Sequence, residues 1–307
     1  MLGKFIDVVT AGIQSRYPCA RIEVHEVLKN NEVLYHGIHI LEEDMQVCPN
    51  IYLENFYDMY KRGDLNLEEI VDAIADIHEE HKDEIKHVEI ARLDFEDVKE
   101  RIIFRLVNTR MNQSILQESP NVPYLDMSIL FYLLVKQDEE RIGSIRITYA
   151  LMKTWTKDVA IRELMKCALR NMPRLFPARV LPILSVIKGQ VLDAMMFSFS
   201  VKEGLSYCGE CGFHSLSNHM GINGAATILY PGILEEIASY FQSDLFVLPS
   251  SVHEVIILPD HNEYTLEELS AMVKEINTRE VDAEEVLSNH AYYYDREQGK
   301  LCQKTNA

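Results

Sequence analysis

The short spacing between apolar segments is the feature that most constrains the fold of this chain. Residues 21–28 (RIEVHEVL) and 33–40 (VLYHGIHI) are two extended runs on either side of Asn30-Asn31. Asparagine tolerates left-handed backbone angles, so the pattern predicts a β-hairpin. Parallel strands need a crossover of about a dozen residues or more, and so short a spacing provides none. We therefore expect antiparallel sheet.

Helical patterns interleave with these strand-sized runs. Residues 2–13 and 67–77 each carry apolar side chains at helical spacing, and capping boxes predict helices after Thr265 and Asp282. Further strands are expected at residues 128–135, 144–151, 194–201, 225–230, 245–248 and 252–258. Because the strand pairs have short connections, we predict an α+β fold with a mixed, largely antiparallel sheet and interleaved helices, rather than a doubly wound one.

Prolines give the best candidate for a boundary within the 307 residues. Pro173, Pro177 and Pro182 cluster after a predicted helix. They predict an N-terminal α+β region over residues 1–172 and a C-terminal α+β region over residues 173–307, with one integrated domain as the alternative.

The charge of the chain excludes several classes of partner. The net charge is −18, from 48 acidic and 30 basic residues, and no cluster of Lys and Arg is present. Binding to nucleic acid by counterion release, or to an anionic membrane, needs such a cluster. The apolar runs are shorter than a bilayer span, and Lys4 and Asp7 interrupt the N-terminal stretch, so we expect no signal peptide. We predict a soluble cytoplasmic protein with reduced cysteines.

Residues 207–224 (YCGECGFHSLSNHMGING) raise the question of a metal site. Cys208, Cys211, His214 and His219 have the donor types that zinc prefers, and four such ligands would close a structural tetrahedron. The alternative is a glycine-rich loop with two free thiols, held by packing of its apolar side chains. In either case we expect a loop that precedes a strand at residues 225–230. The favoured expectation is that the chain has no cofactor, and zinc is the alternative that the sequence allows.

A second group of polar residues suggests catalysis. Asp126, Asn218, His219, His253 and Glu254 are the residues from which a hydrolase site would be assembled. Glu254 falls on the apolar face of a predicted strand, where a carboxylate must find a partner or stay protonated. The ordinary alternative for Asp126 and Glu254 is a structural pair in a turn or core.

In an acidic segment at residues 76–100, His78 and His81 lie one helical turn apart. A solvated helix face is the favoured interpretation, because no third metal ligand is evident nearby in the sequence.

Several phrases carry a family resemblance. They are KNNEVLYHGIHI, CPNIYLENFYDMYKRG, LVNTRMNQSILQESPNVPYLDMSILFYLL, NGAATILYPGIL, LPSSVHEVIILPD and EVLSNHAYYYD. In this order they resemble a domain-of-unknown-function family of anaerobic gut bacteria. The resemblance implies a bacterial cytoplasmic protein, carries over no catalytic residue, and does not include the pair Cys208 and Cys211.

Together these observations favour a protein that acts through protein–protein contact, with a basic partner suited to the acidic surface. A hydrolase with Asp126, His219, His253 and Glu254 is the first alternative, and a small structural zinc site is the second.

Overall fold

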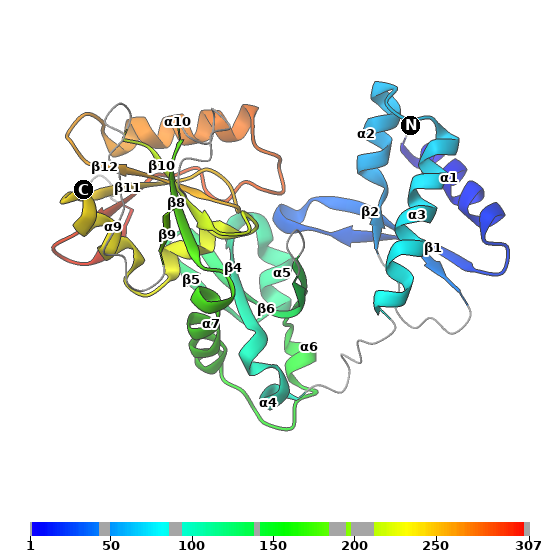
Figure 1. Ribbon diagram of the computed structural model, residues 1–307, viewed down its shortest axis with the longest axis horizontal. Helices are drawn as coiled ribbons and strands as arrows, with labels where there is room; N and C mark the ends of the chain where they lie inside the picture. Colours follow the sequence, from blue (N-terminus) through cyan, green and yellow to red (C-terminus); the bar gives the residue numbers. More distant parts are fainter. Residues whose placement is uncertain are drawn as a thin grey trace. The chain divides into compact units, whose positions relative to one another are not determined.

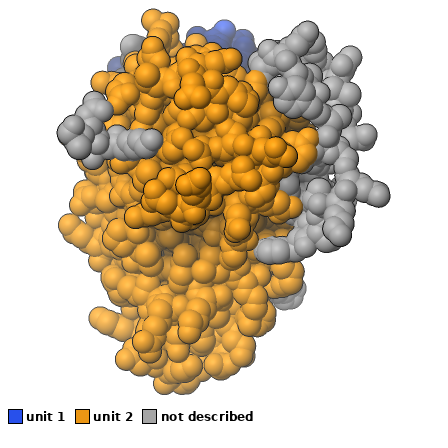
Figure 2. Space-filling view, turned by 90° about the vertical axis from the view of Figure 1, so that its left-hand side faces the viewer, with its two compact units in different colours: residues 1–90 blue, residues 91–307 orange. Residues whose placement is uncertain are grey.

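The computed structural model describes residues 2–42, 50–85, 94–137, 142–183, 195–197 and 212–303. The chain divides into two compact units, residues 1–90 and residues 91–307 (Figures 1 and 2). The predicted boundary between residues 172 and 173 falls instead inside helix α7 (Ile161–Leu175). Pro173 lies in the last turn of that helix, and Pro182 ends strand β8 (Ala178–Pro182), so these prolines end elements within one unit.

Unit 1 combines a small antiparallel sheet with three helices. Its elements are α1 (Leu2–Arg16), β1 (Arg21–Leu28), the 3-10 turn η1 (Asn30–Glu32), β2 (Leu34–Leu41), β3 (Ile51–Tyr52), α2 (Leu53–Arg62) and α3 (Leu67–Ile85). The sheet order is β1-β2-β3. The predicted hairpin is confirmed, and Asn31 takes the left-handed backbone (φ 58°) that the turn requires.

The core of unit 1 lies between the sheet and its helices. Phe5, Val9 and Ile13 form the buried stripe of α1, as their helical spacing predicts. Ile70 and Ile74 of α3 are fully buried in the same cluster. Gly12 allows the two helices to approach, because a Cβ there would meet Val71 Cγ2 at 2.6 Å.

Unit 2 holds the remaining elements. Its helices are α4 (Phe95–Val98), α5 (Gln113–Glu118), α6 (Tyr149–Met152), α7, α9 (Ile233–Phe241) and α10 (Leu266–Arg279), with 3-10 turns η3 (Lys99–Arg101), η4 (Arg110–Asn112) and η5 (Gly224–Leu229). Its strands are β4 (Ile102–Asn108), β5 (Asn121–Tyr124), β6 (Met127–Gln137), β7 (Ile142–Arg146), β8, β9 (Met195–Phe197), β10 (His214–Asn218), β11 (Leu245–Pro249), β12 (Val255–Pro259), β13 (Tyr292–Asp295) and β14 (Lys300–Cys302).

These strands form two sheets. In the first, β6 pairs with β4 on one side and with β5 and β7 on the other. The second has the order β14-β13-β11-β12-β10-β8-β9. Every strand pair in the described residues is antiparallel, so the α+β prediction is confirmed.

Alternation along the strands buries both faces of the larger sheet at its centre. In β12, Val255 and Ile257 point into the main core, which also contains side chains of β4, β6, α7 and α9. Leu258 points to the opposite face, where Leu269 and Val273 of α10 cover it (Figure 1). Side chains alternate faces along a strand, so a continuous apolar run here means burial on both sides.

Several local predictions are wrong. Residues 144–151, predicted as one strand, leave β7 at Arg146 and enter α6 at Tyr149. Residues 214–218, predicted as loop, form β10, whose residues are all buried between β8 and β12. Residues 225–230, predicted as a strand, lie instead in η5 as far as Leu229, with Tyr230 at its C-terminal cap, and the Thr227 hydroxyl donates to the Gly224 carbonyl. Residues 282–285 form a single turn and not the start of a helix.

No helix in the described part of the chain combines the length and apolarity that a bilayer crossing demands.

Candidate functional site

Asp126 joins two distant segments of unit 2. It follows Leu125, which has a left-handed backbone (φ 57°), in the turn between β5 and β6. One carboxylate oxygen accepts a hydrogen bond from Ser288 Oγ at 2.8 Å, and the other accepts from the Tyr292 hydroxyl. Tyr292 is fully buried, and burial together with the Asp126 charge raises the pKa of its hydroxyl. Both oxygens of Asp126 are therefore engaged in holding the segment before β13.

His253 and Glu254 lie in the bend before β12, not in the strand predicted for residues 252–258, and they bond to different partners. The Asn223 backbone N–H donates to His253 Nδ1 at 3.2 Å, so Nε2 carries the proton and donates to Glu285 Oε1 at 3.1 Å. Glu254 accepts a hydrogen bond from the Ser215 hydroxyl. With both ring nitrogens of His253 occupied, no serine hydroxyl is bonded to it as a nucleophile would be.

Asn218 and His219 lie where β10 ends. The Asn218 side chain donates to the Ile222 carbonyl and accepts from the Met220 N–H, which closes the turn after the strand. His219 stacks on the Phe176 ring with centroids 6.3 Å apart, and burial, with a smaller effect of the Arg179 charge, lowers its pKa. Among Asp126, Asn218, His219, His253 and Glu254, no side chain is hydrogen-bonded to another, so the structure does not gather them into one constellation.

The predicted zinc ligands are only partly described. Cys208 and Cys211 lie outside the described residues. His214 and His219 stand at opposite ends of β10, and an extended chain separates their Cα atoms by about 16 Å. His214 Nδ1–H donates to the Gly212 carbonyl at 3.0 Å, and its ring packs on Phe241 of α9. The geometry does not support one ion bound by both imidazoles.

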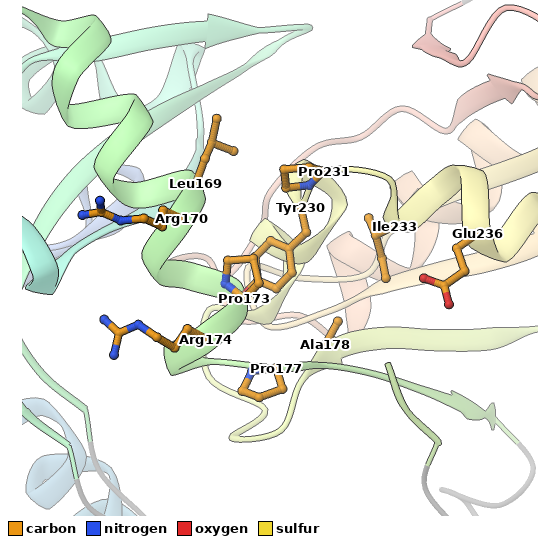
Figure 3. Close-up of a pocket in the computed structure, with 10 residues that line it drawn as sticks. All are labelled: Leu169, Arg170, Pro173, Arg174, Pro177, Ala178, Tyr230, Pro231, Ile233 and Glu236. Atoms are coloured by element: carbon orange, nitrogen blue, oxygen red, sulfur yellow. The ribbon is translucent and has the colours of Figure 1, made fainter. Parts of the chain in front are cut away.

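A cavity in unit 2 has the size of a ligand site. It encloses about 390 Å³ between the C-terminal part of α7 and the start of α9 (Figure 3), within the ~300–1,000 Å³ typical of binding pockets. The residues that line it are mostly apolar and are Leu169, Arg170, Pro173, Arg174, Pro177, Ala178, Tyr230, Pro231, Ile233 and Glu236. We call it the α7–α9 cavity.

Prolines and a tyrosine fix the shape of the α7–α9 cavity. Pro173 has no N–H, so the Leu169 carbonyl one turn earlier in α7 lacks its helical donor. Both residues line the cavity. Tyr230, which forms the centre of the wall in Figure 3, donates its hydroxyl to the Phe176 carbonyl at 2.8 Å. Burial raises the pKa of Tyr230, so this hydrogen bond persists at high pH.

Charged groups at the α7–α9 cavity differ in whether they have partners. Arg170 pairs with the Glu100 carboxylate at 2.6 Å, and Arg174 donates to the Glu100 carbonyl at 3.0 Å. In Figure 3 both guanidinium groups extend away from Ile233 and Glu236. Within the described residues no side chain pairs with Glu236, and partial burial raises the pKa of its carboxyl. Within the part of the chain that the structure describes, the cavity thus offers apolar walls and one carboxylate without a counterion.

Sequence reasoning did not find the α7–α9 cavity. Its residues come from two short segments, 169–178 and 230–236, that are far apart along the chain. The available signal is the proline cluster, which the sequence reasoning assigns to a domain boundary.

The fold and the cavity define an α+β protein of two compact units, with an apolar binding cavity in the larger one. Residues 2–296 match the family of unknown function DUF5688, and the chain belongs to that family. Neither the comparison with curated proteins nor the comparison with solved structures gave a match.

Proposed function

We propose that this protein acts by binding a protein partner, and that the α7–α9 cavity receives an apolar side chain from an extended, basic segment of that partner. The observation that carries the proposal is the combination of apolar walls with the unpaired carboxylate of Glu236. Partial burial deprives this carboxylate of hydrating water. A cationic group of the ligand would replace that water with a charge-assisted hydrogen bond. The net charge of −18 favours a basic partner at longer range.

A peptide fits this cavity better than a purely apolar molecule. The Leu169 carbonyl can accept a hydrogen bond from a peptide N–H, since Pro173 provides no donor. An apolar side chain can fill the space between Pro177, Tyr230 and Ile233. A lysine or arginine close to it in the peptide can reach Glu236. We place this activity in the cytoplasm of a bacterial cell.

The hydrolase alternative has less support. Asp126, His253 and Glu254 are each bonded to other partners, and no described serine hydroxyl bonds to a ring nitrogen of His253, since Ser251 accepts only from the His253 backbone N–H. A structural zinc site at Cys208 and Cys211 remains a separate proposal. Of the described histidines His214 and His219, at most one can be a ligand of that site.

Selection from a random peptide display library tests the binding proposal on the full-length protein. We expect enrichment of peptides with one large apolar residue and a Lys or Arg within a few positions. For a synthetic peptide selected in this way, Glu236→Lys should weaken binding in fluorescence anisotropy by about 10-fold or more, because it replaces an attraction by a repulsion.

Glu235→Lys is the matched control, because this exposed residue adjoins Glu236 on α9 and makes the same change in net charge. It should change the affinity by less than about 2-fold. Equal losses in both variants would mean that only overall charge matters, and the cavity proposal would be wrong. Mass spectrometry of the peptide after incubation should show no cleavage, whereas cleavage would favour the hydrolase.

A further inference from the structure

A fully buried histidine in unit 1 lacks half of its hydrogen bonds. His78 of α3 has an exposed fraction of 0%, so its assignment to a solvated helix face is wrong. Its Nε2 lies 2.8 Å from Glu42 Oε1, while its Nδ1 has no hydrogen-bond partner in the described residues. A buried polar atom left in this way destabilises a fold and calls for an explanation, such as a bound ion.

Two carboxylates converge with this imidazole. Glu42 directly follows β2, and Glu79 is the neighbour of His78 on α3. One ligand atom from each of Glu42, His78 and Glu79 lies within 4.8 Å of the other two. Around a four-coordinate ion with bonds of ~2.0–2.2 Å, adjacent ligand atoms are about 3.4 Å apart. Small rotations of the three side chains would therefore bring their ligand atoms to the distances that such an ion requires. Two carboxylates so close together repel each other, and a cation between them would remove that repulsion.

Tyr17 orients this cluster from the end of α1. Its hydroxyl donates to Glu79 Oε1 at 3.0 Å, and its ring meets the His78 ring edge-on with centroids 5.4 Å apart. The hydroxyl is a donor that fixes the position of the Glu79 carboxylate. Metal ligands in proteins are commonly oriented by such neighbours.

We propose that Glu42, His78 and Glu79 bind a divalent transition-metal ion. One imidazole nitrogen and two carboxylate oxygens suit Zn²⁺ and similar ions, whereas Mg²⁺ and Ca²⁺ prefer sites made of oxygen alone. Three protein ligands leave a coordination position for water, as in catalytic metal sites. Tyr17 is a positioning residue, because it acts on the ion only through Glu79. The site uses no residue of the α7–α9 cavity and does not depend on the proposed peptide binding.

Titration of the full-length protein with ZnCl₂ tests this site. The protein carries Cys208→Ser and Cys211→Ser, so that this pair of thiolates does not contribute, and is first stripped with a chelator. Isothermal calorimetry should give one ion per chain. Glu42→Gln and Glu79→Gln keep the shape of the side chains but remove a negative charge, and each should weaken Zn²⁺ binding by about 10-fold or more. Tyr17→Phe should weaken it by about 10-fold without a change in stoichiometry.

Asp76→Asn is the matched control, since it removes an exposed carboxylate from the same helix but outside the cluster. It should leave the affinity unchanged. Substitution with Co²⁺ should give d–d absorption that disappears in His78→Gln, provided that circular dichroism shows this variant folded. The proposal is overturned if no Zn²⁺ binds to the chain without Cys208 and Cys211, or if Glu42→Gln and Glu79→Gln bind it as tightly as Asp76→Asn does.

Discussion

His214 illustrates how a polar side chain is accommodated inside the larger sheet. Its ring lies 4.8 Å from the Phe241 ring between centroids, and Nδ1–H is satisfied by the Gly212 carbonyl. Burial lowers the pKa of His214, and the hydrogen bond to Gly212 opposes this only in part. The folded protein therefore holds the imidazole in its neutral form, and it does so at the expense of stability in acid.

The lowered pKa of His214 determines how the free energy of unfolding changes with pH. In the unfolded chain the pKa of a histidine is about 6.5. As the pH falls below this value the unfolded chain takes up a proton before the folded protein does, so the free energy of unfolding decreases. His214→Gln should cost about 1–2 kcal/mol at pH 7.5 through lost packing, and its deficit relative to the wild type should shrink towards pH 5.5. Urea denaturation at both pH values measures this difference.

His290→Gln is the control for that experiment, because His290 is exposed. It should leave the pH dependence of the wild type unaltered. A His214→Gln deficit that stays constant between pH 7.5 and pH 5.5 would show that His214 does not titrate differently in the two states.

At the scale of elements, the junction of β10 with η5 depends on one glycine. A Cβ on Gly224 would lie 2.0 Å from Ser217 Oγ, 2.5 Å from the His253 carbonyl oxygen and 2.7 Å from the Asn218 nitrogen. Two of these atoms belong to the backbone and cannot move aside. The φ angle of Gly224 is not positive, so the glycine is needed for space and not for backbone freedom.

Gly224→Ala should therefore destabilise unit 2 by about 1–3 kcal/mol, as overpacking does in other cores. Gly3→Ala is the matched substitution, since nothing lies within 4 Å of a Cβ there. It should raise stability by about 0.5–1 kcal/mol, because alanine favours the helix. Urea midpoints of the two variants should move in opposite directions, and a Gly224→Ala midpoint equal to that of the wild type would contradict the close packing.

The same junction shows why sequence reasoning succeeded for some elements and failed for others. The stripe of α1 and the capping box of α10 depend on local spacing, and both are confirmed. β10 is buried although its sequence, HSLSN, is polar, because its serines bond across the sheet: Ser215 to Glu254 and Ser217 to the His253 carbonyl. Such partners are distant in sequence, and no local pattern indicates them.

The candidate sites were beyond sequence reasoning for a similar reason. The α7–α9 cavity is lined by ordinary apolar residues that only the tertiary fold brings together. For His78 the missing ligand was Glu42, which lies 36 residues earlier and reaches α3 from the end of β2. Asp126 bonds to Ser288 and Tyr292, which come from the far end of the chain and which no local pattern indicates.

At the scale of the whole molecule, each unit has a core of its own. The cluster around Phe5, Ile38 and Ile70 draws only on unit 1, and the main cluster around Phe104, Leu216 and Ile257 draws only on unit 2. A compact region that buries its own apolar residues can fold alone. We therefore expect fragments 1–90 and 91–307 each to unfold in a cooperative transition.

The single tryptophan of the chain allows this expectation to be tested for each unit. Trp155 is buried against Phe95 in unit 2, with ring centroids 5.6 Å apart. Its fluorescence should report the same sigmoidal urea transition in fragment 91–307 as in the full chain, because its surroundings belong to that fragment. Fragment 1–90 lacks tryptophan and is followed by far-ultraviolet circular dichroism. The expectation fails if either fragment shows a broad transition and binds a hydrophobic dye at neutral pH, because both are signs of a loosely packed state. The unit in that fragment would then need the rest of the chain to form its core.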